Sequence, residues 1–179
     1  LTSVKDPRGV TPATYGYDAS GRLTGSTDAF SASTTFTHDL TGKKETVTDA
    51  LGNTTVFEYD DDGNVVKKTD ALGKVWLSTY DTNDNKLSET DPLGHTRSWT
   101  YDASFNVLTE TDGLGRIRSY TYGPNRRMKT RTDAIGRTTT DGWDFFYAHR
   151  LSHVDPSGAT TSFFYNTKGW LETTTDPRG

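Results

Sequence analysis

Residues 91–112 read DPLGHTRSWTYDASFNVLTETD, and this stretch decides the fold. It opens with Asp91-Pro92-Leu93-Gly94, a turn signal in which Asp can bond the backbone two residues on, Pro presets φ and Gly closes the turn. The segment that follows alternates and places Trp99 and Tyr101 on one face, which is the period of a β-strand. Asp102 begins a second turn, after which a short strand with an apolar anchor returns to the next Asp turn.

The same unit recurs at intervals of 21 or 22 residues along nearly the whole chain. A fixed period of this length predicts a repeat architecture in which each unit packs against its neighbours. We divide the chain into an N-terminal flank at 1–5 and a repeat region at 6–179, with eight tandem repeats and the start of a ninth. The copy at 28–31 is degenerate, because Ser31 stands where the closing Gly is expected. The turns open at Asp6, Asp28, Asp49, Asp70, Asp91, Asp112, Asp133, Asp155 and Asp176.

Each repeat is predicted to contain two strands and two turns, so the expected fold class is all-β, with hairpins of ~21 residues chained into a curved antiparallel sheet. The aromatic pair of the outgoing strand is expected to lie beside the Val, Leu or Met anchor of the return strand. This position makes the aromatics the repeating core rather than a ligand platform. The residues expected to carry the repeat signature are Asp49, Gly52, Phe57, Tyr59, Asp60, Gly63, Asp91, Pro92, Gly94, Trp99, Tyr101, Asp102, Asp112, Gly115, Tyr120, Tyr122, Asp155, Gly158, Phe163, Tyr165 and Gly169.

The composition favours thin, extended β-structure over a domain with one thick core. Hydrophobic residues make up 31% of the chain, 12% of the residues are aromatic and the net charge is only -4. The lack of cysteine excludes a disulfide framework and a thiolate metal site. No apolar run approaches the roughly 20 residues of a membrane helix, and the mild acidity argues against a nucleic-acid partner. The N-terminal residues lack signal-peptide character, so we interpret the chain as a fragment of a longer protein.

The spacing Asp-x-x-Gly, aromatic-x-Tyr-Asp-x-x-Gly-x-Val/Leu and Thr-Asp resembles the Rhs/YD-repeat family, and the resemblance extends from Asp6 to Gly179. It implies repeats that coil into a spiralling β-sheet and close as a hollow shell. In bacterial Rhs effectors and Tc toxin components the shell encloses a toxic C-terminal domain, whereas in teneurins a similar barrel is extracellular and serves adhesion. The resemblance also implies structural repeats without catalytic residues. The self-cleaving segment of bacterial members is not found in this sequence.

Two repeats depart from the pattern, and both are candidate contacts for a partner. In the seventh, Trp143-Asp144 replaces Tyr-Asp and the following Gly is absent, which predicts a bulge or a wider loop. In the fourth, the aromatic comes early at Trp76, and Asn83-Asp84-Asn85 stands where the Gly turn is expected.

Several features suggest chemistry, but each has a simpler structural interpretation. The recurring carboxylates are what turn chemistry produces, rather than the single acid pair of a glycosidase. The loop Asp60-Asp61-Asp62-Gly63-Asn64 offers oxygens for calcium but lacks the ligand pattern of a helix-loop-helix site, which favours a solvated hairpin turn. On a strand, His149 and His153 would lie roughly 13 Å apart, too far for one zinc ion. A basic stretch interleaved with tyrosines is interpreted as a solvated patch: Arg116, Arg118, Arg126, Arg127, Lys129, Arg131 and Arg137.

We therefore expect no enzyme, no cofactor and no metal, and a hydrolase is the least favoured class. The leading hypothesis is a segment of a toxin-enclosing shell, secreted or delivered from bacteria, with the rest of the parent shell and an enclosed toxin domain as partners. The alternative is an extracellular adhesion or carbohydrate-binding scaffold, in which Trp143 and Trp170 stack on sugars. Exposed sheet edges predict self-association in either case.

Overall fold

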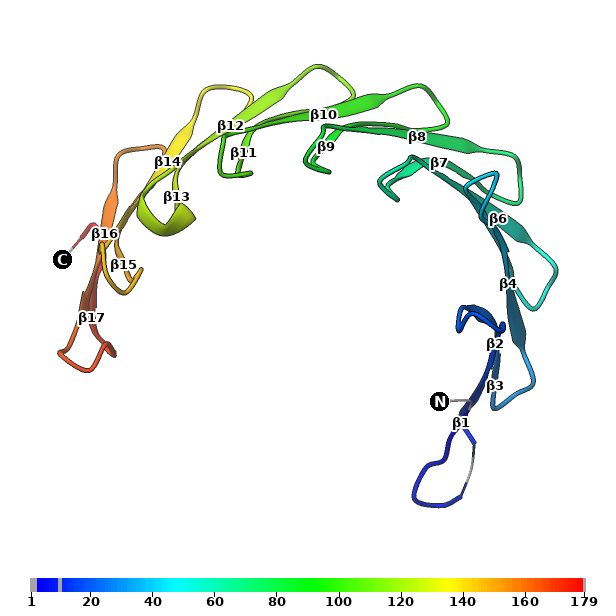
Figure 1. Cartoon of the computed structure of the whole chain (residues 1–179). Helices are drawn as coiled ribbons and strands as arrows, with labels where there is room; N and C mark the ends of the chain where they lie inside the picture. Colours follow the sequence, from blue (N-terminus) through cyan, green and yellow to red (C-terminus); the bar gives the residue numbers. More distant parts are fainter. Residues whose placement is uncertain (1–2, 10, 179) are drawn as a thin grey trace. The chain divides into compact units, whose positions relative to one another are not determined.

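The computed structural model describes residues 3–9 and 11–178, which form an all-β fold (Figure 1). The first two residues of the predicted flank, Val10 and the Gly179 of the ninth turn lie outside the described residues. The chain divides into two compact units, Leu1–Asp84 with Glu89–Gly94, and Asn85–Ser88 with His95–Gly179. Strand β9 (Lys86–Thr90) contributes residues to both units.

Unit 1 is an antiparallel meander in which each strand from β1 to β8 pairs with the next along the chain. Alternating Thr, Val and aromatic residues suit these strands, because branched and aromatic side chains pack well on a pleated surface. Its strands are β1 (Ser3–Val4), β2 (Ala13–Tyr17), β3 (Leu23–Asp28), β4 (Ser33–Asp39), β5 (Lys44–Thr48), β6 (Thr54–Tyr59), β7 (Val65–Thr69) and β8 (Val75–Tyr80).

Unit 2 continues the same pattern, with each strand from β10 to β17 paired to the next. A single 3-10 turn, η1 (Pro124–Arg126), stands at the β12–β13 hairpin. The predicted all-β antiparallel repeat is therefore confirmed. The strands are β10 (Thr96–Tyr101), β11 (Val107–Thr111), β12 (Ile117–Tyr122), β13 (Met128–Thr132), β14 (Thr138–Trp143), β15 (Arg150–Val154), β16 (Thr160–Tyr165) and β17 (Leu171–Thr175).

The sheet is one layer thick, and this decides where its apolar residues lie. No hydrophobic or polar side chain is buried anywhere in the described residues. The aromatics expected as a repeating core, such as Trp99 and Tyr122, are half-buried, because a single layer has no second layer to cover them. Stability must therefore come from contacts between neighbouring strands. Among the described residues, no helix is both long and apolar enough to span a membrane.

Six hairpins share a shift of register at the end of the outgoing strand, whereas β4–β5 pairs without one. In β10–β11, Thr100 pairs with Thr109 but Tyr101 pairs with Val107, so one residue of the return strand is left over. The predicted bulge at Trp143 is present, but it does not distinguish the seventh repeat, because the same shift occurs at Tyr17, Tyr59, Tyr101, Tyr122 and Tyr165. In each of these hairpins the shift brings the last aromatic opposite the first residue of the return strand.

Candidate functional site

The turns are held by the side chain of their opening Asp. In the turn at Asp102, Oδ1 accepts hydrogen bonds from the backbone N–H groups of Ser104 at 2.8 Å and Asn106 at 2.9 Å, and Oδ2 accepts one from the Asn106 side chain at 2.9 Å. The backbone closes the loop, because Phe105 N donates to the Asp102 carbonyl at 3.0 Å. One carboxylate thereby satisfies three donors, as an Asx turn does.

The same geometry occurs at both turns of the repeat, although their sequences differ. At Asp49, Oδ1 accepts from the N–H groups of Leu51 and Asn53, each at 2.9 Å. The fourth residue adopts a left-handed φ, +83° at Gly52, where glycine carries no steric cost. Where glycine is missing, other residues take that conformation, as Ser31 does with φ 66° and Asp84 with φ 62°. The departure predicted in the fourth repeat is therefore a change of residue rather than of turn type.

These hydrogen bonds set the ionisation of the turn carboxylates. The asparagine side chain at position 53 lowers the pKa of Asp49, and the one at position 106 lowers the pKa of Asp102, with backbone N–H groups adding to both effects. The Ser157 hydroxyl and N–H similarly lower the pKa of Asp155. A glycosidase acid needs a raised pKa, whereas these carboxylates are stabilised as anions. Their chemistry is that of turn capping.

A second recurrent contact joins each repeat to the one before it. The Tyr122 hydroxyl, at the end of β12, donates to the Val107 carbonyl at the start of β11 at 2.8 Å, while Tyr122 itself opposes Met128 of β13. The ring therefore ties three consecutive strands together. Burial against these strands is the main cause that raises the pKa of Tyr122.

The same donor-to-carbonyl contact, always 15 residues back, is made by several kinds of side chain. Tyr101 donates to Lys86 O at 2.8 Å and Tyr80 to Val65 O at 3.2 Å. His38 Nε2 lies 2.7 Å from Leu23 O, and Trp143 Nε1 donates to Met128 O at 2.7 Å. This explains why the position accepts Tyr, His or Trp but no Phe: Tyr17, His38, Tyr59, Tyr80, Tyr101, Tyr122, Trp143 and Tyr165.

Sequence reasoning placed these aromatics on one face but missed the hydrogen bond. The signal was present, because the partner position two residues earlier does accept Phe, at Phe36, Phe57 and Phe163. A position that excludes Phe but accepts three different donors indicates a required N–H or O–H group.

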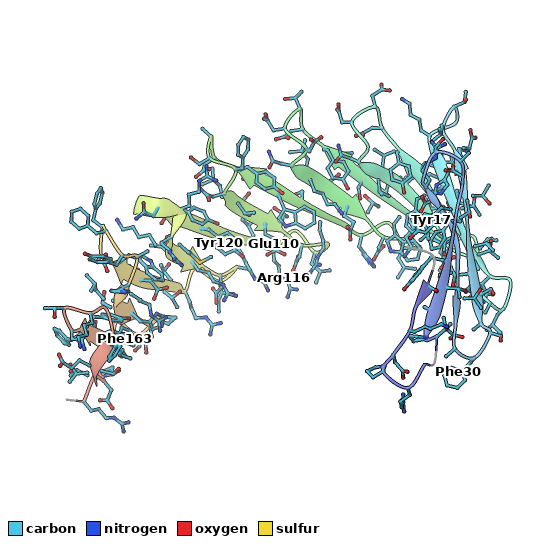
Figure 2. All side chains as sticks on the ribbon, turned by 60° about the horizontal axis from the view of Figure 1, so that its bottom comes forward. Tyr17, Phe30, Glu110, Arg116, Tyr120 and Phe163 are labelled. Carbon is cyan, nitrogen blue, oxygen red and sulfur yellow. The ribbon has the colours of Figure 1, made fainter. Side chains whose placement is uncertain are left out.

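Charged side chains pair across the strands. Glu58 on β6 lies between Lys67 at 2.8 Å and Lys44 at 3.5 Å, and the hydrogen bond from Lys67 is the main cause that lowers the pKa of Glu58. In unit 2, Figure 2 shows Glu110 beside Tyr120, whose hydroxyl donates to Glu110 Oε2 at 3.3 Å. These are cross-strand pairs that hold a sheet.

The candidate metal and nucleic-acid features resolve into local pairs. Asp60 Oδ1 accepts from the N–H groups of Asp62 and Asn64, as Asp49 Oδ1 accepts from those of Leu51 and Asn53. His149 Nδ1 lies 3.3 Å from Asp144, and His153 Nδ1 lies 2.8 Å from Asp141, so each histidine pairs with a different carboxylate. No cluster of His, Cys, Asp or Glu suited to a metal ion occurs within residues 3–9 and 11–178.

The basic stretch is partly neutralised within its own turns. Arg116 pairs with Asp112 and Arg137 with Asp133, each at 2.7 Å. The Arg127 guanidinium lies 5.5 Å from the centre of the Trp143 ring. The ring that was a candidate for sugar stacking thus already has a cation beside it and a carbonyl on its N–H.

The seventh repeat has the wider loop that its sequence predicted. Asp144 N donates to the carbonyl of His149, one residue further along than in the other turns, and the Asp144 carboxylate accepts from Tyr147 N and His149 N. Phe145, Phe146 and Tyr147 are exposed at its tip. His149 stacks on Tyr165 with ring centres 4.3 Å apart, beside a hollow of about 720 Å³.

Comparisons with known proteins agree with this architecture. The RHS Repeat family model matches residues 1–33, 17–54, 45–75, 59–96, 80–117 and 147–179, well over half of the chain. Chains in two structures, TcdB2-TccC3-Cdc42 and TcdB2-TccC3, are similar with a TM-score of 0.71 and 14% identity over 92% of this chain. A Photorhabdus luminescens Tc holotoxin pore matches 86% of this chain, with the same TM-score and 15% identity.

The chain spans about a tenth of the length of these solved chains, 11% in the first two and 9% in the third. The comparison with curated proteins gives no match. At these identities the structural likeness establishes the fold, and the family follows from the repeated sequence matches. The chain belongs to the RHS repeat family.

Proposed function

We propose that the chain is a wall segment of a closed repeat shell, whose parent protein encloses a toxic C-terminal domain. The observation that carries the proposal is the match of 92% of the chain to a tenth of a much longer chain in the TcdB2-TccC3 structures. A segment of this kind forms part of the wall and has no catalytic role. The parent protein would be secreted or delivered from bacteria, as the similarity to a Tc holotoxin suggests.

The repeat chemistry suits a wall. The contacts described above lie within one turn or join neighbouring strands or repeats, so the array can lengthen without needing a larger core. The turn carboxylates and the cross-strand ion pairs are satisfied locally. The mechanism is therefore containment, in which the sheet separates the enclosed domain from the solvent.

The experiment is protease protection of the intact parent protein. We expect the C-terminal domain to resist digestion while the repeats are folded, and to be digested once urea unfolds them. The matched control is the C-terminal domain expressed alone, which should be cleaved under native conditions. Equal cleavage of the domain inside the parent and alone would refute containment, as would a parent that ends in a membrane anchor without a separate domain.

One observation supports the alternative of a carbohydrate-binding scaffold. Trp170 is 66% exposed, and exposed aromatic rings are suited to stacking on sugars. The Lys168 ammonium lies 5.5 Å from the centre of that ring. A glycan-binding screen of the chain and of Trp170→Ala tests this alternative, which requires binding by the first and loss of binding by the second.

A further inference from the structure

The two faces of the sheet in unit 2 differ in chemistry. Residues that oppose each other on neighbouring strands lie on the same face of a sheet, so the register assigns each paired residue to one side. On one side a row of hydroxyls crosses the five strands from β10 to β14: Thr100, Thr109, Ser119, Thr132 and Thr138. We name this side the hydroxyl face.

The hydroxyl face carries no charged side chain at any paired position of β10 to β17, all of which lie in the part of the chain that the structure describes. Opposing hydroxyls bond each other, as those of Thr121 and Thr130 do at 2.6 Å. Short neutral groups thus cover this side of unit 2. Its paired positions hold serine or threonine, apart from Ile117, Gly142, Val154 and Phe164.

The opposite side of unit 2, which we name the aromatic face, carries the large and charged side chains. The Arg150 guanidinium lies 4.7 Å from the centre of the Phe163 ring. A long charged side chain that covers a ring and keeps its own charge in water is typical of a surface that faces solvent. The paired positions of this face include Trp99, Glu110, Arg118, Tyr120, Arg131 and Asp141.

Unit 1 has a hydroxyl face as well, with charges that cancel. Thr35 of β4 opposes Thr48 of β5 on this side. Charged residues of alternating sign follow one another on four consecutive strands, and Glu58 lies between two of them, at 2.8 Å from Lys67 and 3.5 Å from Lys44. The four charged residues at paired positions are Asp39, Lys44, Glu58 and Lys67.

We propose that the hydroxyl face lines the inside of the closed shell, with the aromatic face outside. This inference rests on the proposed function. Closing a sheet places alternate residues of each strand inside and outside. The tips of side chains converge on the concave side and spread on the convex side, so serine and threonine fit inside, whereas arginine, tryptophan and tyrosine fit outside. Charges on the outer side also keep a large protein soluble.

The occupant of the inside is the C-terminal domain of the same parent protein, and a neutral lining suits it. A lining rich in charges and rings would form ion pairs and stacking contacts with the enclosed domain, and these would oppose its release. Serine and threonine side chains offer no charge and little apolar area. The domain is therefore retained by enclosure, without affinity for the wall.

Cysteine accessibility in the intact parent protein tests which face lies inside. The 179 residues contain no cysteine, so Thr121→Cys introduces a thiol on the hydroxyl face of β12 and Arg118→Cys introduces one on its aromatic face. Both replaced side chains are exposed in this chain. In the native parent, a maleimide with a long polyethylene glycol chain should modify Arg118→Cys faster than Thr121→Cys by roughly tenfold or more. In urea both should react fully, and the mass of the modified peptide identifies the thiol.

A second pair on β10, Arg97→Cys and Thr100→Cys, has the same spacing and should give the same order if a variant of the first pair fails to fold. Faster reaction of the thiol on the hydroxyl face overturns the inference and leaves containment standing. Slow reaction of both thiols also overturns it, since the aromatic face would then not lie outside. Fast reaction of both overturns it together with the proposed function, because the wall would not close.

Discussion

Replacing Tyr122 with Phe removes one hydroxyl and keeps the ring, so it isolates the hydrogen bond that ties one repeat to the preceding one. The bond to the Val107 carbonyl is 2.8 Å long and half-buried. A neutral hydrogen bond contributes about 0.5–1.5 kcal/mol net. Partial access of water to the freed carbonyl keeps the cost near the middle of that range. We expect Tyr122→Phe to lower the free energy of unfolding by about 1 kcal/mol, which lowers Tm by about 2–4 °C in a chain of this size.

Urea denaturation followed by tryptophan fluorescence measures this change, because the chain has four tryptophans. The matched control is Tyr147→Phe, which removes the same hydroxyl from a ring that is 78% exposed and should leave stability unchanged. The double variant Tyr101→Phe/Tyr122→Phe should lose about 2 kcal/mol, since the two bonds share no atoms. If Tyr122→Phe unfolds at the same urea concentration as Tyr147→Phe, the bond does not hold the repeats together.

Three further outcomes follow from the turns. Asp102→Ala should destabilise the chain and Asp102→Asn should do so less, because Asn keeps one oxygen that accepts the backbone N–H groups; chemical denaturation ranks them. Gly94→Ala should lower the free energy of unfolding by about 1 kcal/mol, because Gly94 has a left-handed φ of 86°. Ser31→Gly should raise it, because Ser31 adopts the same conformation with φ 66°. Thermal melts that show neither change would contradict the turn assignment. The pKa values of Asp49 and Asp102 are lowered in the folded chain, so the unfolded chain binds protons more readily. The stability that these carboxylates contribute should therefore be present above about pH 4 and be lost as the pH falls below it. Urea midpoints measured down to about pH 3 test the direction of this change.

The sequence predicted the strands and turns well because both depend on local chemistry. The alternation that put Trp99 beside Tyr101, and the Asp that opens each turn, act within a few residues of the chain. Bonds between repeats were harder to predict. The contact of Tyr122 with the carbonyl at position 107 depends on which strands are neighbours. It also depends on a register shift that cannot be predicted from the sequence of one repeat.

The seventh repeat shows the same difference between local features, which the sequence predicts, and bonds between repeats, which it does not. Its wider loop could be predicted from the missing Gly, because turn geometry is local. The retention of the inter-repeat bond could not, since it requires that the Trp143 N–H reach the same carbonyl position that a tyrosine hydroxyl reaches elsewhere. The pairing of His153 with Asp141 was missed for the same reason, because it joins β15 to β14.

The lack of any buried side chain in the described residues decides how a wall of this kind is stabilised. A single layer can satisfy its backbone and its turn carboxylates, but it leaves its apolar groups only partly covered. Adding repeats lengthens the layer without thickening it, so burial in a core cannot supply the stability. Each repeat is instead tied to the one before it by a hydrogen bond such as that from Tyr122 to the Val107 carbonyl, and every repeat added can bring a bond of this kind. The wall can therefore grow in length while each repeat keeps the same contacts with its neighbours.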